Sequence, residues 1–235
     1  MRTFLLAALA AIVATAPADA ATRNFGIENF TKIRVDGPFK VRLTTGVPPS
    51  AKATGPQSAL DQVAVEIIGR TLVIHNSLSA WGGTLDSGDS GPVEVVIGTH
   101  ELNAASLTGA GSLEINAVKG LSFDLSAQGS GQIAIARADV DQMTVGLIGT
   151  ASAVLAGKAG TLKVRAQGTS SLDGSGLDAK DVSLTVNGAS TIKAGVSNSA
   201  DIVASGPASI SFSGNPSCTS RLTGSASVTG CRRSQ

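Results

Sequence analysis

From Leu102 onward, apolar and polar positions recur in the same order around glycines that stand 18 to 20 residues apart. Apolar residues stand mostly two and four positions before each glycine and four positions after it, with polar or small residues between them. Alternate residues of a strand face the same side, so each repeat predicts two strands that share one core. The glycine marks a corner where positive φ or close backbone approach excludes larger side chains. The central glycines are Gly109, Gly129, Gly149, Gly168, Gly188, Gly206 and Gly224.

A third apolar position follows eight to ten residues after the glycine in most repeats and predicts a third short strand. These positions are Val118, Ala138, Ala159, Leu177 and Val196. Three short strands per repeat, in phase through about seven coils over residues 101–231, predict an all-β fold, the parallel β-helix or solenoid. An antiparallel sandwich also has many short strands, but it would not keep corner and apolar offsets in phase.

A polar position three residues after each glycine forms a predicted ladder beside the apolar one. Its members are Ser112, Gln132, Ser152, Ser171, Thr191, Ser209 and Ser227. Stacked turns would place these side chains next to one another on the outside of the solenoid.

Residues 21–100 predict a less regular β region ahead of the solenoid. Apolar and polar residues alternate, or β-branched residues cluster, in segments bounded by Gly, Pro or Asp. The predicted strands are 31–35, 39–44, 63–67, 71–75 and 93–97, and residues 58–63 could form one helical turn. Between Ser77 and Pro92 the chain is polar and Gly-rich and holds Trp81, the single tryptophan.

The first twenty residues have the pattern of a secretory signal peptide. Arg2 precedes an apolar run over residues 4–13, and Ala18-Asp19-Ala20 provides a cleavage site between Ala20 and Ala21. The run is short for a membrane span, so an N-terminal anchor helix is the weaker alternative. We therefore expect a single mature domain over residues 21–235 in the periplasm, at the cell surface or secreted.

Cys218 and Cys231 are the only cysteines. Export to an oxidising compartment favours a disulfide between them, and the short loop would gain roughly 3 kcal/mol from chain entropy. Two cysteines without matching histidines argue against a zinc site.

Several segments together resemble the DUF2807 family, also described as the putative autotransporter adhesin head GIN domain. The resemblance covers about residues 29–216 and rests on Phe30-x-x-Ile33-x-Val35-x-Gly37-x-Phe39-x-Val41-x-Leu43, Leu72-Val73-Ile74, the repeated Leu-x-Gly-x-Gly-Ser units and Phe212-Ser213-Gly214-Asn215-Pro216. It implies a right-handed parallel β-helix, bacterial export and an adhesive role, and it brings no catalytic residues. The residues after Cys231, Arg232-Arg233-Ser234-Gln235, do not resemble a translocating β-barrel.

Charge and candidate chemistry narrow the function. The net charge of +1 gives no electrostatic support for a nucleic-acid partner. Paired carboxylates for glycoside cleavage must lie about 5 to 9 Å apart, whereas Asp124 and Asp201 share an offset four coils apart. Asp173 and Lys193 share an offset on adjacent coils and predict a cross-strand charge pair.

The remaining acidic pairs and both histidines indicate structural roles. Asp139 with Asp141 and Asp178 with Asp181 suit return turns. Two carboxylates at Asp86 and Asp89 are too few for a calcium site, and the Gly-rich corners lack both calcium ligands and a phosphate-loop context. His75 and His100 stand in no recognisable Ser/His/Asp arrangement. We predict no catalytic residue, cofactor or metal.

The sequence thus predicts a non-enzymatic, adhesin-like or structural module that contacts an envelope or extracellular partner, either glycan or protein, or a second copy of itself. Trp81 is the candidate partner contact because its ring could stack on a sugar or enter a partner surface; its alternative role is to cover the open end of the solenoid. The alternatives to the adhesin are a glycan-binding or polysaccharide-active β-helix protein and a periplasmic assembly accessory.

Overall fold

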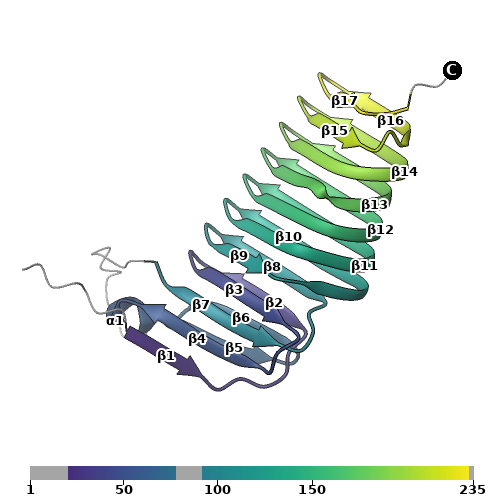
Figure 1. Cartoon of the computed structure of the whole chain (residues 1–235). Coiled ribbons are helices and arrows are strands. Elements are labelled where there is room, and N and C mark those ends of the chain that lie inside the picture. Colours follow the sequence, from purple (N-terminus) through teal and green to yellow (C-terminus); the bar gives the residue numbers. More distant parts are fainter. Residues whose placement is uncertain (1–20, 78–91, 233–235) are drawn as a thin grey trace, which may run out of the picture.

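The computed structural model describes residues 21–77 and 92–232. Strand accounts for 73 % and helix for 2 % of the structure, which is a β-solenoid of about six turns joined to a nearly closed, barrel-like N-terminal region (Figure 1). Ala20 and Trp81 lie outside the described residues, so signal cleavage and the partner contact stay predictions. Ala21 begins the first strand and pairs with Gly55.

The N-terminal region contains seven strands and one short helix. They are β1 (Ala21–Phe25), β2 (Lys32–Asp36), β3 (Lys40–Thr45), β4 (Ser50–Gly55), α1 (Gln57–Leu60), β5 (Val63–Ile68), β6 (Thr71–Asn76) and β7 (Glu94–Thr99). The five strands predicted here are present within one or two residues of the expected bounds, and the helical turn expected over 58–63 lies at 57–60, whereas β1 and β4 were not predicted. These two segments are polar and alanine-rich, so they carry no strong β pattern.

The solenoid follows as a stack of parallel strands, seen as rungs in Figure 1. Its strands are β8 (Ala104–Gly109), β9 (Ser112–Ile115), β10 (Val118–Gly129), β11 (Gln132–Gly149), β12 (Ser152–Gly168), β13 (Ser171–Asn187), β14 (Thr191–Ser205), β15 (Ser209–Ser213), β16 (Ser217–Thr223) and β17 (Ser227–Thr229). The three short strands predicted per coil are joined in the middle turns into one continuous strand of 15 to 18 residues. The strand bends where the pairing register shifts, for example between Ile135 and Ala138.

The corner assignment is confirmed at all seven glycines, which have φ between 86° and 113°. The corners stack directly: a Cβ at Gly149 would lie 2.8 Å from the carbonyl oxygen of Gly129, and one at Gly168 would lie 2.7 Å from that of Gly149. A side chain at these positions would therefore be strained by its backbone and would also meet the turn below.

Two outer sheets meet at the corners and enclose the core. Sheet A contains β5, β6, β2 and β8, the segments of β10–β14 that precede each corner glycine, and β16. Sheet B contains β1, β4, β7, β3 and β9, the segments of β11–β14 that follow each corner, and then β15 and β17. A third set of segments, here called the bend, closes each turn on the side away from the glycines.

The inward columns of both sheets are buried as the offsets predict. Leu107, Leu125, Val145 and Leu147 face inward from sheet A, and Leu113 and Ile133 face inward from sheet B, each at most 2 % exposed. A small-residue column two positions after each corner is also buried. In it, the hydroxyls of Ser170 and Ser190 lie 3.1 Å apart and Ser190 donates to the Gly168 carbonyl.

The N-terminal region continues the same two sheets in an order that differs from the sequence order. The β2–Gly37–β3 unit forms an extra corner that lies directly beside the β8–Gly109–β9 turn, with Val35 opposite Leu107 and Val41 opposite Leu113. The β6 and β7 strands stack on its other side. This eighth corner was not predicted because Gly37 lies far from Gly109 in the sequence.

The two ends of the solenoid differ. At the N-terminal end, β5 pairs antiparallel with β6, and β4 pairs antiparallel with both β7 and β1. Phe30 and Leu60 are buried there at 2 % and 1 % exposure. At the C-terminal end, the predicted disulfide joins Cys218 and Cys231 with Cα atoms 5.7 Å apart.

Candidate functional site

Two of the columns formed by the outward side chains of sheet A contain cations and run along the solenoid axis. Pairing of residues between neighbouring strands defines them, because paired residues on one face of a sheet lie about 5 Å apart. The Arg165 column contains Val73, Arg34, Ser106, Ser126, Gly146, Arg165, Thr185, Val203 and Arg221. The Lys163 column contains Thr71, Lys32, Ala104, Asp124, Thr144, Lys163, Ser183, Asp201 and Thr219.

A hollow of about 440 Å³ lies on this face, between β2 and β12. Its floor is low because small residues occupy successive strands at Ala104, Ser106, Ser126 and Gly146. Lys32 and Arg34 line one end, and Arg165 lines the other.

A second hollow of about 290 Å³ continues on the far side of Arg165. It is lined by polar side chains of three neighbouring strands: Gln142, Thr144, Lys163, Arg165, Ser183 and Thr185. The two hollows share Thr144 and Arg165, so Arg165 stands between them.

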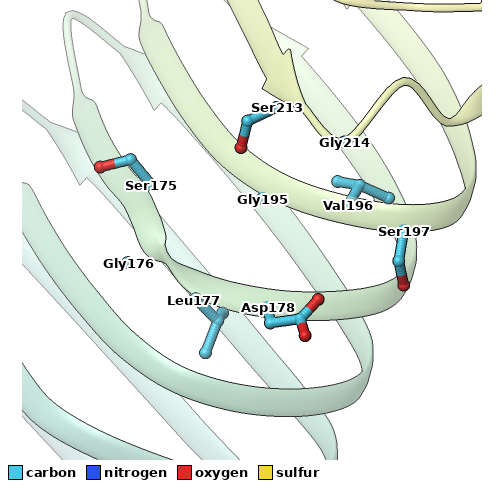
Figure 2. A pocket seen from close by; sticks show the side chains of 9 residues that line it. All are labelled: Ser175, Gly176, Leu177, Asp178, Gly195, Val196, Ser197, Ser213 and Gly214. Atoms are coloured by element: carbon cyan, nitrogen blue, oxygen red, sulfur yellow. The ribbon is translucent and has the colours of Figure 1, made fainter.

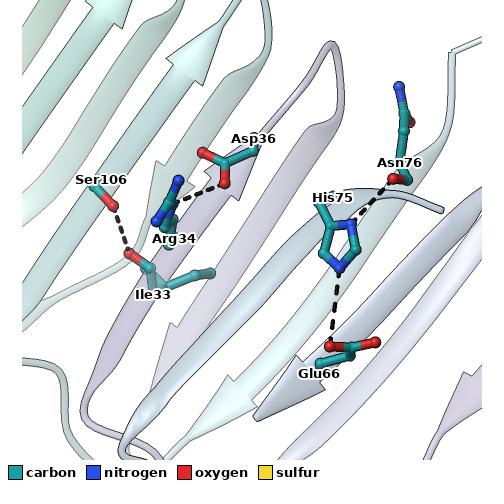
Figure 3. Close-up of polar contacts among 7 residues, drawn as sticks. All are labelled: Ile33, Arg34, Asp36, Glu66, His75, Asn76 and Ser106. Carbon is teal, nitrogen blue, oxygen red and sulfur yellow. Dashed lines mark hydrogen bonds and ion pairs between the residues drawn. The ribbon is translucent and has the colours of Figure 1, made fainter. Parts of the chain in front are cut away.

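The N-terminal end of this face is held by polar contacts (Figure 3). Arg34 Nε lies 2.7 Å from Asp36 Oδ2, and Ser106 donates to the Ile33 carbonyl, which links β8 to β2. His75 Nε2 lies 3.9 Å from Glu66 Oε2 across the β5–β6 pair, and its Nδ1 lies 3.0 Å from the Asn76 carbonyl oxygen. Among the described residues, the polar contacts of His75 are therefore with Glu66 and Asn76, and they include no serine.

On sheet B, the cations Arg42 and Lys193 stand beside carboxylates. Arg42 bridges Glu94 at 2.8 Å and Glu114 at 3.3 Å on the two neighbouring strands. Lys193 stands opposite Asp173, as the offsets predict. The predicted hydroxyl ladder from Ser112 to Ser227 is in register on this face.

A third hollow of about 300 Å³ lies on the bend, where the β13 register shifts (Figure 2). Its lining is mostly glycine, serine and aliphatic side chains, with Asp178 as the single ionisable group. One carboxylate with no partner in the lining gives this notch no acid–base pair.

The acidic pairs of the sequence lie apart or have structural partners. Asp124 and Asp201 stand in one column with three strands between them, which at about 4.8 Å per strand is about 19 Å and too far for paired acid–base chemistry. Asp173 accepts hydrogen bonds from the side chain and backbone of Ser175, which lower the pKa of its carboxyl.

On the bend, hydrogen bonds from Ser199 at 2.6 Å and Asn198 at 2.7 Å lower the pKa of Asp181. Asp139 and Asp178 both pair with Lys158, and Asp139 pairs on its other side with Lys119, so opposite charges alternate across neighbouring strands. Such pairs stabilise a sheet modestly. These carboxylates therefore have structural surroundings.

Among the residues that the structure describes, neither a group of metal ligands nor a membrane-spanning helix is found. Within 21–77 and 92–232, no group of three or more His, Cys, Asp or Glu side chains is placed to hold a metal ion. No helix among the same residues is long and apolar enough to cross a membrane.

A family model described as "Putative auto-transporter adhesin, head GIN domain" (DUF2807) matches residues 29–216. The chain belongs to the DUF2807 family. The comparison with curated proteins found no match. Membership in DUF2807 therefore supplies a family description and no assigned reaction.

Solved structures of distantly similar proteins show the same fold. A putative adhesin from Bacteroides fragilis is 20 % identical with a TM-score of 0.77, covering 90 % of this chain and 96 % of its own. A protein from Parabacteroides distasonis named a putative lipid binding protein is 17 % identical, with a TM-score of 0.72 and coverage of 89 % and 96 %. A putative adhesin from Parabacteroides merdae is 15 % identical, with a TM-score of 0.68 and coverage of 89 % and 95 %.

Sequence reasoning did not single out Lys163 and Arg165. The signal was present, because Arg165 stands three positions before Gly168, between the two apolar offsets already aligned, and Lys163 stands five positions before it, next to the outer one. If the outward positions three and five residues before each corner glycine are aligned in the same way, small and hydroxyl-bearing residues of neighbouring repeats fall beside Lys163 and Arg165.

Proposed function

We propose that this protein is an exported, non-enzymatic, adhesin-like module that holds an envelope or extracellular partner on the outward face of sheet A. The observation that carries the proposal is the pair of adjoining hollows around Arg165, on a face whose side chains are fixed by the stacking of turns. A rigid array of this kind favours binding because little side-chain or loop ordering is required.

The family description and the names of the structural relatives support the adhesive part of the proposal. The spacing of carboxylates on sheet A supports the non-enzymatic part. Asp124 and Asp201 are the outward acids of its Lys163 column, and their separation leaves no pair that could cleave a glycosidic bond by the usual route.

The proposed function is tested by measuring saturable binding of the purified protein to immobilised bacterial envelope material and to extracellular-matrix preparations. The same preparations are then examined for chain shortening of their polysaccharides. We expect binding without turnover. Absence of saturable binding to every preparation, or turnover of a polysaccharide, would contradict the proposal.

Location is tested separately by surface proteolysis of intact cells that make the full chain. Digestion of the protein on intact cells supports adhesion, and protection until the outer layer is opened supports a periplasmic role. Detection of the protein only in the cytoplasm would overturn the proposed export.

A further inference from the structure

The pair Lys163 and Arg165 is the strongest unneutralised charge on sheet A. Both side chains are exposed, two residues apart on β12, and therefore on the same face. Neither forms an ion pair among the described residues, whereas Arg34 is paired with Asp36 and Arg42 with two glutamates.

The residues directly opposite this pair are small or hydroxyl-bearing, and the diagonal neighbour Asp181 on β13 is engaged by Ser199 and Asn198. Thr144 and Ser183 stand beside Lys163, and Gly146 and Thr185 stand beside Arg165. The nearest carboxylates in the Lys163 column lie two strands away on either side, about 10 Å by strand spacing. Two cations with free donors next to open hollows form a surface complementary to an anion.

Lys32 provides a second charge at the other end of the large hollow. It stands in the same column as Lys163 with three strands between them, so the two ammonium positions are about 19 Å apart along the axis. The positive charge on this face is therefore sparse and linear, and Ala104, Asp124 and Thr144 stand between its two centres in the column.

We propose that sheet A binds a linear acidic polysaccharide whose chain runs along the solenoid axis. A carboxylate or sulfate is held by Lys163 and Arg165, the sugar rings lie over Ser126 and Gly146, and a later acidic group reaches Lys32. This inference rests on the proposed function, since it names the ligand class for the same face.

The low density of positive charge on sheet A argues against nucleic acids and anionic membranes as ligands. Duplex DNA carries one charge per about 1.7 Å of axis, far denser than two basic centres about 19 Å apart. The outward positions listed for the two columns contain no aromatic side chain on which unpaired bases could stack. Anionic membranes attract clusters of about four to eight Lys or Arg, whereas Asp124 and Asp201 interrupt the cations here. A polymer with spaced acidic groups matches this pattern.

Asp124 allows a test in which the proposal predicts stronger, not weaker, binding. Its exposed carboxylate lies beside the path of the chain, in the column between Lys32 and Lys163. It repels an acidic ligand, so removal of its charge should strengthen binding of an acidic polysaccharide and leave binding of a neutral one unchanged.

The experiment measures binding of the purified protein to immobilised hyaluronan, which carries a carboxylate on every second sugar, with dextran as the neutral probe. The test variant is Lys163→Gln with Arg165→Gln. The matched control is Lys52→Gln with Lys193→Gln, which removes the same charge from exposed positions of sheet B. Circular dichroism melting checks that each variant is folded.

We expect hyaluronan binding to weaken by about tenfold or more in the sheet A variant and by less than about twofold in the control. Asp124→Asn should bind more tightly, and added salt should weaken binding of the unaltered protein. Equal losses in both double variants, equal binding of dextran, or weaker binding by Asp124→Asn would overturn the inference.

A folded protein that binds envelope or matrix preparations but not hyaluronan, polygalacturonate or chondroitin sulfate would overturn the acidic-polysaccharide inference and leave the proposed function standing. Loss of binding to all preparations would overturn both. Competition by an acidic peptide in place of the polysaccharides would assign the face to a protein partner and also count against the inference.

Discussion

Sheets A and B are built from the same turns, yet their outward faces have different chemistry. On sheet B, Arg42 lies between two glutamates and Lys193 faces Asp173. On sheet A, Lys163 and Arg165 face threonine, serine and glycine. Inward positions are fixed by the need to fill one shared core, whereas outward positions are free to differ. The need to fill the core therefore does not account for the unpaired cations Lys163 and Arg165 on sheet A.

The largest expected effect comes from a corner that both sheets share. Gly149→Val places a branched side chain at φ 90°, where even a Cβ would lie 2.8 Å from the Gly129 carbonyl oxygen. Backbone strain and overpacking together should lower the free energy of unfolding by about 4 kcal/mol. Urea denaturation measures it, with Ser152→Ala on the outward ladder as a control that should change stability by less than about 0.5 kcal/mol.

Core truncation should affect the two sheets alike. Leu147 of sheet A and Leu113 of sheet B are both fully buried, so Leu147→Ala and Leu113→Ala should each cost about 3 kcal/mol. Denaturant midpoints of the two variants measure the costs. A large cost on one sheet with almost none on the other would contradict a single shared core.

Substitution of a surface arginine should affect stability on sheet B but not on sheet A. Arg42→Gln removes the two ion pairs that join β3 to Glu94 and Glu114, which should cost about 1 kcal/mol at these half-exposed positions. Arg165→Gln breaks no ion pair and should leave the thermal midpoint nearly unchanged. Equal destabilisation by the two variants would remove the distinction between a structural and a functional arginine.

The smallest effect concerns the bend. Since the hydrogen bond from Ser199 is the largest cause that lowers the pKa of Asp181, Ser199→Ala should raise that pKa toward its ordinary value. A lowered native pKa stabilises the fold above the unfolded pKa, and this stability is lost as pH falls through the native value. Carboxyl NMR titration measures the shift. An unchanged Asp181 pKa would contradict the assignment, because it would mean that Asn198 and the remaining surroundings lower the pKa without Ser199.

The sequence predicted the solenoid well because its fold follows from local repetition. Corner glycines, inward columns and the Ser112 ladder all depend on spacings of 18 to 20 residues. The extra corner at Gly37 was missed because its spatial neighbour Gly109 lies 72 residues away and Phe39 replaces the usual small residue. Pairing across such a distance is set by tertiary packing, which a local pattern does not record.

The candidate site was less predictable for a different reason. The balanced net charge conceals unpaired cations, because only the register shows that no carboxylate stands directly opposite Lys163 or Arg165 on the adjoining strands. Trp81, the contact favoured by composition, lies outside the described residues, so its role stays a prediction.

Lysine footprinting with hyaluronan tests the central claim most directly. The protein is acylated with a lysine-reactive reagent, with and without the polysaccharide, and each site is quantified by mass spectrometry. Binding along sheet A predicts protection of Lys163 and Lys32, while Lys52 and Lys193 on sheet B react as before. Protection of the sheet B lysines, or equal protection of all four, would contradict sheet A as the recognition face.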